Sequence, residues 1–132
     1  MRIRSLIRPA AAVGLASATV LALMPSPASA DPATRQPGCR STAKALNGAD
    51  DNGHWPKFST AVTTTSCADI NVRPNINISV STCFHPSSGG ISCNAWRDIP
   101  AGTWGLAATD VRDYTRFHLN IYPPYATGLV AY

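Results

Sequence analysis

Three histidines, His54, His85 and His118, are the residues of this sequence best suited to acid–base catalysis or zinc binding. No two of them are three or four residues apart, and the sequence contains no glutamate, so the H-E-x-x-H pattern of zinc hydrolases is absent. Each histidine lies in a different predicted segment. We therefore expect three solvated or locally hydrogen-bonded histidines, with no metal site and no cofactor.

The positions of the serines and aspartates do not favour a serine nucleophile or a catalytic carboxylate pair either. The sequence has no G-x-S-x-G elbow for a serine nucleophile. The two aspartates nearest to a carboxylate pair, Asp110 and Asp113, flank a predicted turn. The run Asp50-Asp51-Asn52-Gly53 lacks the alternation and the closing glutamate of a calcium loop, and we interpret it as a turn. We assign no catalytic residue and expect the protein not to be an enzyme.

Aromatic side chains are better candidates for binding. Trp55, Tyr122 and Tyr125 have no evident position in a core, and exposed Tyr and Trp are common in surfaces that bind proteins or sugars. The alternative is that these rings cap the ends of the domain with only their polar tips in water. Two loops add exposed polar residues to the candidates. The candidate binding residues are Trp55, Ser87, Ser88, Arg97, Tyr122 and Tyr125.

The first thirty residues have the pattern of a secretory signal peptide. Three arginines precede an apolar stretch from Ala10 to Met24, and Ala28-Ser29-Ala30 supplies a small-x-small cleavage site. The apolar stretch is shorter than the roughly 20 residues that span a membrane. We expect cleavage after Ala30, secretion of residues 31–132, and no membrane attachment of the mature chain.

Removal of the signal peptide lowers the formal net charge from +4 to +1, because Arg2, Arg4 and Arg8 leave with it. The remaining basic residues are scattered along the sequence, whereas a nucleic-acid surface needs clustered Lys and Arg. We therefore expect an extracellular protein or polysaccharide as partner, no nucleic acid, and a monomer.

Alternating hydrophobic residues predict antiparallel strands over most of the chain after residue 58. Between Ile70 and Phe84 most apolar residues are even-numbered and most polar ones odd-numbered, which predicts one buried and one solvated face. One strand of this length would measure about 50 Å, which is longer than a domain of this size. Pro74 therefore splits it into strands at 69–73 and 76–84. The sequence predicts an all-β fold, a small antiparallel β-sandwich or barrel.

A later strand shows the same alternation. Phe117, Leu119 and Ile121 occupy its inward phase. Its outer face then carries Arg116, His118, Asn120 and Tyr122.

Four cysteines in a short exported chain indicate two disulfides, with three connectivities open. Antiparallel pairing across the turn-rich loop 85–90 places Cys83 opposite Cys93, at the surface or edge of the sheet. Elimination leaves Cys39 with Cys67. The same register places Trp96 opposite Val80, inside the sandwich.

We divide the chain into a signal peptide at 1–30, a polar leader at 31–58 and a β domain at 59–132. Within the leader, residues 41–48 form either a short helix, with Ser41 as N-cap and Gly48 as terminator, or no regular element. The pairing of Cys39 with Cys67 tethers the leader to the β domain.

Four segments resemble small secreted proteins of actinobacteria such as Streptomyces: Cys67-Ala-Asp-Ile-Asn-Val, Val80-Ser-Thr-Cys-Phe, residues 100–111 and the closing Gly-Leu-Val-Ala-Tyr. The resemblance covers residues 67–132. It implies export and a compact β domain, and it carries no catalytic or binding residues onto this sequence.

The placing of a cysteine before an alternating strand, and of a Pro-Gly turn before another, is also similar to the small two-disulfide β-sandwich inhibitors of α-amylase. Their Trp-Arg-Tyr inhibitory triplet has its nearest match in Trp96-Arg97-Asp98, which departs at the third position. This similarity implies inhibition of a secreted hydrolase.

Together these features predict a small secreted, non-enzymatic interaction protein, with inhibition of a hydrolase as one version. The candidate loops for that version are Ser87–Gly90 and Trp96–Asp98. One alternative is a polysaccharide-binding module that uses the exposed aromatic residues. The other is a small hydrolase with an Asp–His mechanism.

Overall fold

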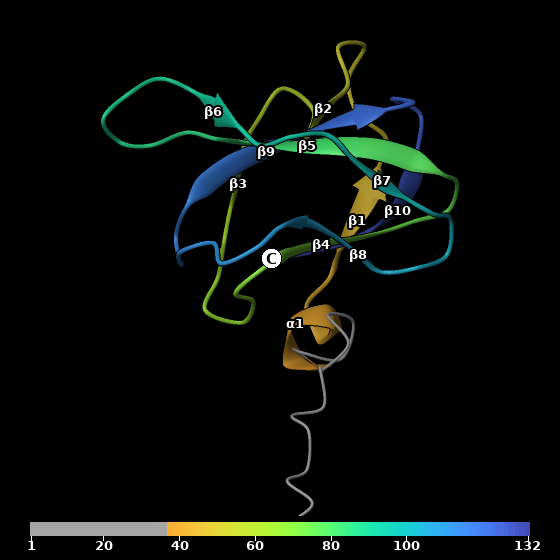
Figure 1. The fold of residues 1–132 in the computed structure, drawn as a ribbon, viewed down its shortest axis with the longest axis horizontal. Helices are drawn as coiled ribbons and strands as arrows, with labels where there is room; N and C mark the ends of the chain where they lie inside the picture. The colour runs from red at the N-terminus through yellow and green to blue at the C-terminus, as the bar shows by residue number, and fades with distance from the viewer. Residues whose placement is uncertain (1–36) are drawn as a thin grey trace, which may run out of the picture.

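A computed structural model describes residues 37–132 of the chain, so the predicted signal peptide and the first part of the leader lie outside the described residues. The described part is nearly all β structure (Figure 1). Its elements are α1 (Pro37–Ser41), β1 (Lys44–Asn47), β2 (His54–Trp55), β3 (Ala61–Val62), β4 (Ile70–Pro74), β5 (Ile78–Phe84), β6 (Ser92–Cys93), β7 (Arg97–Ile99), β8 (Gly105–Ala108), β9 (Arg116–Tyr122) and β10 (Thr127–Ala131). No helix among these residues is long and apolar enough to cross a membrane.

The strands form two antiparallel sheets that pack face to face (Figure 1). The smaller sheet has the order β1-β10-β4-β8, and the larger has the order β2-β9-β5-β6, with β3 paired to β9 and β7 paired to β5. Together with the two disulfides, this arrangement confirms the predicted all-β sandwich.

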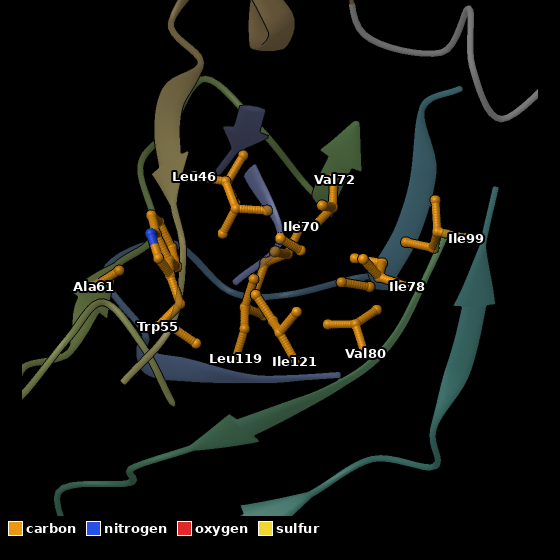
Figure 2. Close-up of a cluster of buried hydrophobic side chains, with 14 of the residues drawn as sticks. Leu46, Trp55, Ala61, Ile70, Val72, Ile78, Val80, Ile99, Leu119 and Ile121 are labelled. Atoms are coloured by element: carbon orange, nitrogen blue, oxygen red, sulfur yellow. The ribbon is translucent and has the colours of Figure 1, made fainter. Parts of the chain in front are cut away.

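The core lies between the sheets and is built from the inward residues of both. Figure 2 shows Ile70 and Val72 of β4 facing Val80 of β5 and Leu119 and Ile121 of β9. All five side chains are buried. Each buried aliphatic side chain contributes about 1.5–3 kcal/mol relative to exposure, so this alternation is what drives the two sheets together.

The predicted break at Pro74 is confirmed, and it is a change of sheet. β4 belongs to the smaller sheet and β5 to the larger, so the chain crosses the sandwich between them. Ile76 lies in that crossing and is 37% exposed, although it is in phase with the buried residues.

The outer faces of β4 and β5 are less solvated than we expected. Asn71 is buried because it lies against the Cys39–Cys67 disulfide, with its Nδ2 3.6 Å from Cys39 Sγ. Ser81 is buried because the segment after β6 covers it, and its hydroxyl donates to the Asn94 carbonyl at 2.8 Å.

The N-terminal segment differs from both alternatives that the sequence left open. Residues 44–47 form the edge strand β1, paired with β10, and the short helix lies earlier, at Pro37–Ser41. Leu46 is buried in the core, and that burial with the backbone pairing outweighs a weak local helix preference. Because β1 and β2 are part of the two sheets, the sandwich begins before the expected boundary at residue 59.

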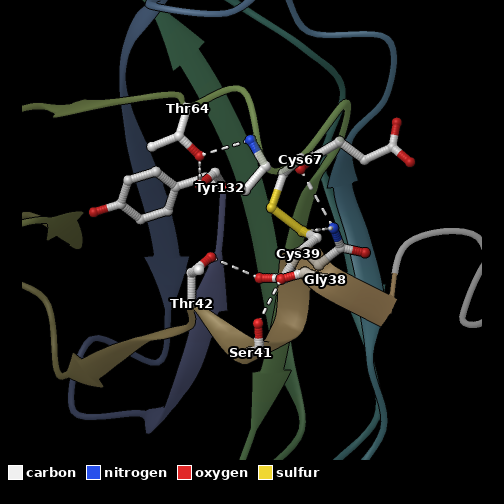
Figure 3. Close-up of a disulfide and its surroundings, with 10 residues drawn as sticks. Gly38, Cys39, Ser41, Thr42, Thr64, Cys67 and Tyr132 are labelled. Carbon is white, nitrogen blue, oxygen red and sulfur yellow. Dashed lines mark hydrogen bonds between the residues drawn. A yellow bond between two sulfur atoms is a disulfide. The ribbon is translucent and has the colours of Figure 1, made fainter.

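Both predicted disulfides are present. Cys83 and Cys93 pair across β5 and β6 at the edge of the larger sheet. Cys39 joins Cys67 and ties α1 to the chain before β4 (Figure 3). Trp104 packs against the Cys39–Cys67 bridge, in a small cluster separate from the main core.

Trp96 does not face Val80, and that expectation is wrong. The pairing of β5 slips by one residue between β6 and β7, so Val80 lies opposite Arg97 and Trp96 is 56% exposed. The side chain of Asn94 hydrogen-bonds backbone groups at the slip. It accepts from the Thr82 backbone N–H at 2.7 Å and donates to the Ala107 carbonyl at 2.7 Å. A side-chain amide thus replaces a strand's backbone groups at an irregularity of the β-bulge type.

Replacing this amide removes both hydrogen bonds and leaves buried backbone groups with fewer partners. We expect Asn94→Ala to lower the free energy of unfolding by about 2 kcal/mol, as measured by urea denaturation of the oxidised protein. Asn75→Ala is the matched control, because its amide donates to Thr127 Oγ1 on the exposed surface. Equal losses in the two variants would contradict this role for Asn94.

Candidate functional site

The three histidines, far apart in the sequence, meet on the outer face of the larger sheet. Register causes this, because His54 of β2 lies opposite Asn120, and His118 of β9 lies opposite Cys83 of β5. His85 follows two residues after Cys83 and returns to the same face. The His118 ring centroid is 4.7 Å from that of His54 and 5.0 Å from that of His85. The expectation that each histidine is solvated or bonded only locally is therefore wrong.

His85 and His118 are joined by a hydrogen bond of 2.7 Å between Nε2 of His85 and Nδ1 of His118. One of these nitrogens must carry a hydrogen and the other must accept it. The two rings therefore cannot both be fully protonated while this contact persists. The contact can hold or pass on a proton.

The carboxylate of Asp50 lies beneath the cluster and is fixed by the turn that we predicted. Its Oδ1 accepts from the backbone N–H groups of Asn52 and His54, both at 2.9 Å, and its Oδ2 is 3.9 Å from His54 Nδ1. The hydrogen bond from the His54 N–H is the largest of the influences that lower the pKa of Asp50. The turn is held on β9 by Gly53, whose carbonyl accepts from the Ile121 N–H at 2.8 Å.

Burial lowers the pKa of His118 below its ordinary value of 6.5, and the nearby His54 and His85 lower it further. The side chain of Asn120 acts in the opposite direction, with a smaller effect. His118 is therefore held as a neutral imidazole near neutral pH, which makes it a proton acceptor.

These groups lie in a cavity of about 430 Å³ that we call the histidine pocket. Its lining is Asp50, His54, Phe58, Ser59, Thr60, His85, Ile91 and His118. Phe58 and Ile91 are apolar yet 91% and 61% exposed. Within residues 37–132, no group of three or more His, Cys or Asp side chains is arranged to hold a metal ion. The pocket can bind a ligand and exchange protons with it.

A second hollow, the basic groove, lies on the other side of His85. It measures about 690 Å³. Its lining is His85, Pro86, Ser87, Gly89, Arg112, Tyr114, Thr115 and Arg116. No acidic residue lines it, so it offers positive charge and hydroxyl groups to a ligand.

A third hollow, the tyrosine groove, measures about 440 Å³ and lies at the opposite end of β5 and β9. Tyr122 lines it and is 69% exposed. Asn77, Ser79 and Asp98 supply polar groups along the same groove, and Ser79 donates a hydrogen bond to Asp98. An exposed ring beside amide, hydroxyl and carboxylate groups is an arrangement suited to sugars.

The structure separates the residues that the sequence put forward as binding candidates. The prediction that Trp55 is a binding residue is wrong, because Trp55 is only 6% exposed and its ring packs edge-on to Tyr132 within the core. Tyr125 is exposed but lies in a different hollow from Tyr122, beside Asn47 and Lys57.

The other candidates are all at the surface. Ser87 and Ser88 lie exposed in the hairpin loop after β5, and Ser87 lines the basic groove. Arg97 is exposed on β7, where its guanidinium donates to the Leu106 carbonyl at 3.3 Å.

Sequence reasoning missed the histidine pocket and the basic groove. The alternation had placed Arg116 and His118 on the outer face of their strand, and that placement is correct. The missing information was which strands flank β9, since only the pairing with β2 and β5 brings in His54 and His85.

The chain matches no family model, and comparisons with curated proteins and with solved structures gave no significant match.

We expect the stability of the protein to fall as the pH is lowered below about 6.5, the unfolded-state value for a histidine. The pKa of His118 is lowered in the folded state, so the unfolded chain binds this proton more readily and acid favours unfolding. Asp50 keeps its contribution through this range, because its pKa is also lowered, from 3.8. Urea unfolding at a series of pH values between about 8 and about 5 measures the slope.

His118→Gln is the control for this pH dependence. We expect this substitution to reduce the slope of stability against pH, because it removes the group whose pKa is lowered in the folded state. An unchanged slope in His118→Gln would show that His118 is not the group responsible.

Proposed function

We propose that this chain is a small secreted protein that acts by binding another extracellular protein and does not itself catalyse a reaction. Its predicted signal peptide supports export, and its two disulfides suit an oxidising environment. The histidine pocket has proton donors and acceptors, but the hydroxyl of Ser59, in its lining, donates to a neighbouring carbonyl at 3.4 Å and not to a base. Binding is therefore better supported than nucleophilic catalysis.

The single observation that carries this proposal is the exposure of Phe58 and Ile91 at the mouth of the histidine pocket. Both side chains line one hollow while remaining largely in water. Paired apolar side chains of this exposure are typical of contact sites, because burying each against a partner contributes about 1.5–3 kcal/mol. The pocket between them has room for a side chain of the partner.

The hairpin loop between β5 and β6, residues 85–91, supports the inhibitor version of this proposal. It projects from the edge of the sandwich (teal, left in Figure 1), and every residue from Pro86 to Ile91 is exposed. The Cys83–Cys93 bridge closes its base. Such a tie reduces the conformational entropy that a loop loses when it enters the cleft of a hydrolase.

We expect the oxidised chain from residue 31 to retain one secreted protein at stoichiometric yield from spent culture medium, with secreted proteases and amylases as the first candidates to assay for inhibition. With that partner purified, Ile91→Ser should weaken binding about tenfold, the loss of one well-buried aliphatic contact. Biolayer interferometry measures the dissociation constants.

Ile76→Ser is the matched control, since Ile76 is a partly exposed isoleucine in the crossing between β4 and β5 and does not line the pocket. No partner at micromolar concentration, or equal effects of the two substitutions, would count against this surface.

The tyrosine groove favours a second candidate function, the binding of an extracellular polysaccharide. Stacking of a sugar ring on Tyr122 would be combined with hydrogen bonds to Asn77 and Asp98, and the groove lies on paired strands that hold these groups in place.

For this second candidate we expect Tyr122→Ala to reduce retention on an insoluble glycan by about tenfold, because one aromatic contact is lost. Depletion assays with cellulose, chitin, xylan and starch measure the retention. Tyr125→Ala is the control, because Tyr125 is exposed to a similar degree but lies outside the groove. Retention that depends equally on both tyrosines, or on neither, would contradict a specific groove.

A further inference from the structure

The basic groove has features that the proposed binding of a protein at Phe58 and Ile91 does not use. Arg112 and Arg116 both line it. Among residues 37–132, the one ion pair is that between His54 and Asp50, so neither arginine has a carboxylate within ion-pair distance. Two exposed guanidinium groups thus line the same hollow without a contact ion pair, and Asp113, which lies between them in the sequence, does not line it.

The segment that carries these arginines is fixed by a buried threonine. The Thr63 hydroxyl donates to the Arg112 carbonyl at 2.7 Å and accepts from the Thr115 N–H at 2.8 Å. The Thr63 backbone adds two more hydrogen bonds, to Thr115 O and from Tyr114 N–H, both 3.0 Å. The arginines therefore project from a backbone that is already ordered, which lowers the entropy cost of holding a ligand.

The opposite wall of the groove is fixed to the same strand. The backbone N–H of His85 donates to the Arg116 carbonyl at 2.9 Å, so the start of the hairpin loop lies against the start of β9. Ser87 and Thr115, with their hydroxyl groups, and Arg112 and Arg116, with their guanidinium groups, all line the groove. Their hydrogen-bond donors outnumber what one planar carboxylate can accept, whereas a phosphate offers three or more oxygens and up to two negative charges.

We infer that the basic groove binds the phosphate group of a small organic phosphate, with Arg112 and Arg116 as its charged contacts. The groove is larger than one phosphate needs, at about 690 Å³, and so has room for the organic part. Tyr114 is 75% exposed beside it and offers an aromatic face to a sugar or a base. This site lies on the other side of His85 from the proposed protein contact and goes beyond that function.

The test is a titration of the oxidised chain from residue 31, at low ionic strength, followed by amide chemical shifts and by calorimetry. The probes are inorganic phosphate, glucose 6-phosphate and AMP, with glucose and adenosine as their uncharged counterparts. We expect the phosphorylated probes to bind, with the largest shifts at residues 85–89 and 112–116, and the uncharged ones not to bind.

Arg112→Gln and Arg116→Gln should each weaken binding of the phosphorylated probes about tenfold, the loss of one charge-assisted contact. Arg97→Gln is the matched control, because Arg97 is an exposed arginine on β7 outside the groove. An equal loss in Arg97→Gln would overturn the inference, because it would mean that net charge alone attracts the anion. Absence of binding by every phosphorylated probe would overturn it too, as would binding of single-stranded RNA without binding of AMP.

Discussion

The antiparallel pairing of β5 with β9 is the constraint on which the rest of the structure depends. These are the two longest strands, and they lie side by side at the centre of the larger sheet. Their register sets Val80 beside Ile121 on the inner face and Cys83 beside His118 on the outer face. Because side chains alternate along both strands, a slip of one residue would turn core residues of one strand to the outer face and would break the pairing that places Cys83 beside His118.

That one register also distributes the candidate sites along the sheet. At one end of the pair Ser79 lies opposite Tyr122, and the tyrosine groove forms there. At the other end Phe84 lies opposite Phe117, and the histidine pocket and the basic groove form around the chain that continues from β5. The disulfide from Cys83 holds the hairpin loop at this second end. The sites are therefore positioned by rigid elements, although several of their side chains come from loops.

The sequence predicted those parts of the fold that depend on residues close together in the chain. Alternation of apolar residues was enough to find the core strands, and Pro74 marked the change of sheet because proline cannot donate in a ladder. Trp96 was misplaced because a one-residue slip is invisible in the sequence, where nothing indicates that the Asn94 amide can stand in for backbone groups. The strand β1 was missed for a related reason, since its partner β10 lies at the far end of the chain.

The histidine pocket was unpredictable for a different reason, because it depends on pairings among strands that are distant in sequence. No spacing rule joins His54 to His118; they meet because β2 pairs with β9. The burial of Trp55 depends on the same pairing of β2 with β9 and was unpredictable for the same reason. Trp55 follows His54 and lies opposite Leu119 on the inner face of that pairing, so a residue that seemed suited to a surface is part of the core.

Departures from an optimally stable sandwich gather around the end of the sheet that holds the histidines. Of the three non-glycine residues with positive φ, Phe58 at 56° and Tyr114 at 59° line the two hollows and are largely exposed, whereas Asp110 at 52° lines neither. The Oδ1 atom of Asn120, beside His54 and His118, is buried without a hydrogen-bond partner, and two arginines nearby lack a carboxylate. The positive φ of Phe58 and Tyr114 costs stability, and these two residues and the two arginines lie around two hollows that share His85. Local strain and unpaired polar groups concentrate where a protein's sequence serves binding more than folding, which makes this end of the sheet the first place to look for a ligand.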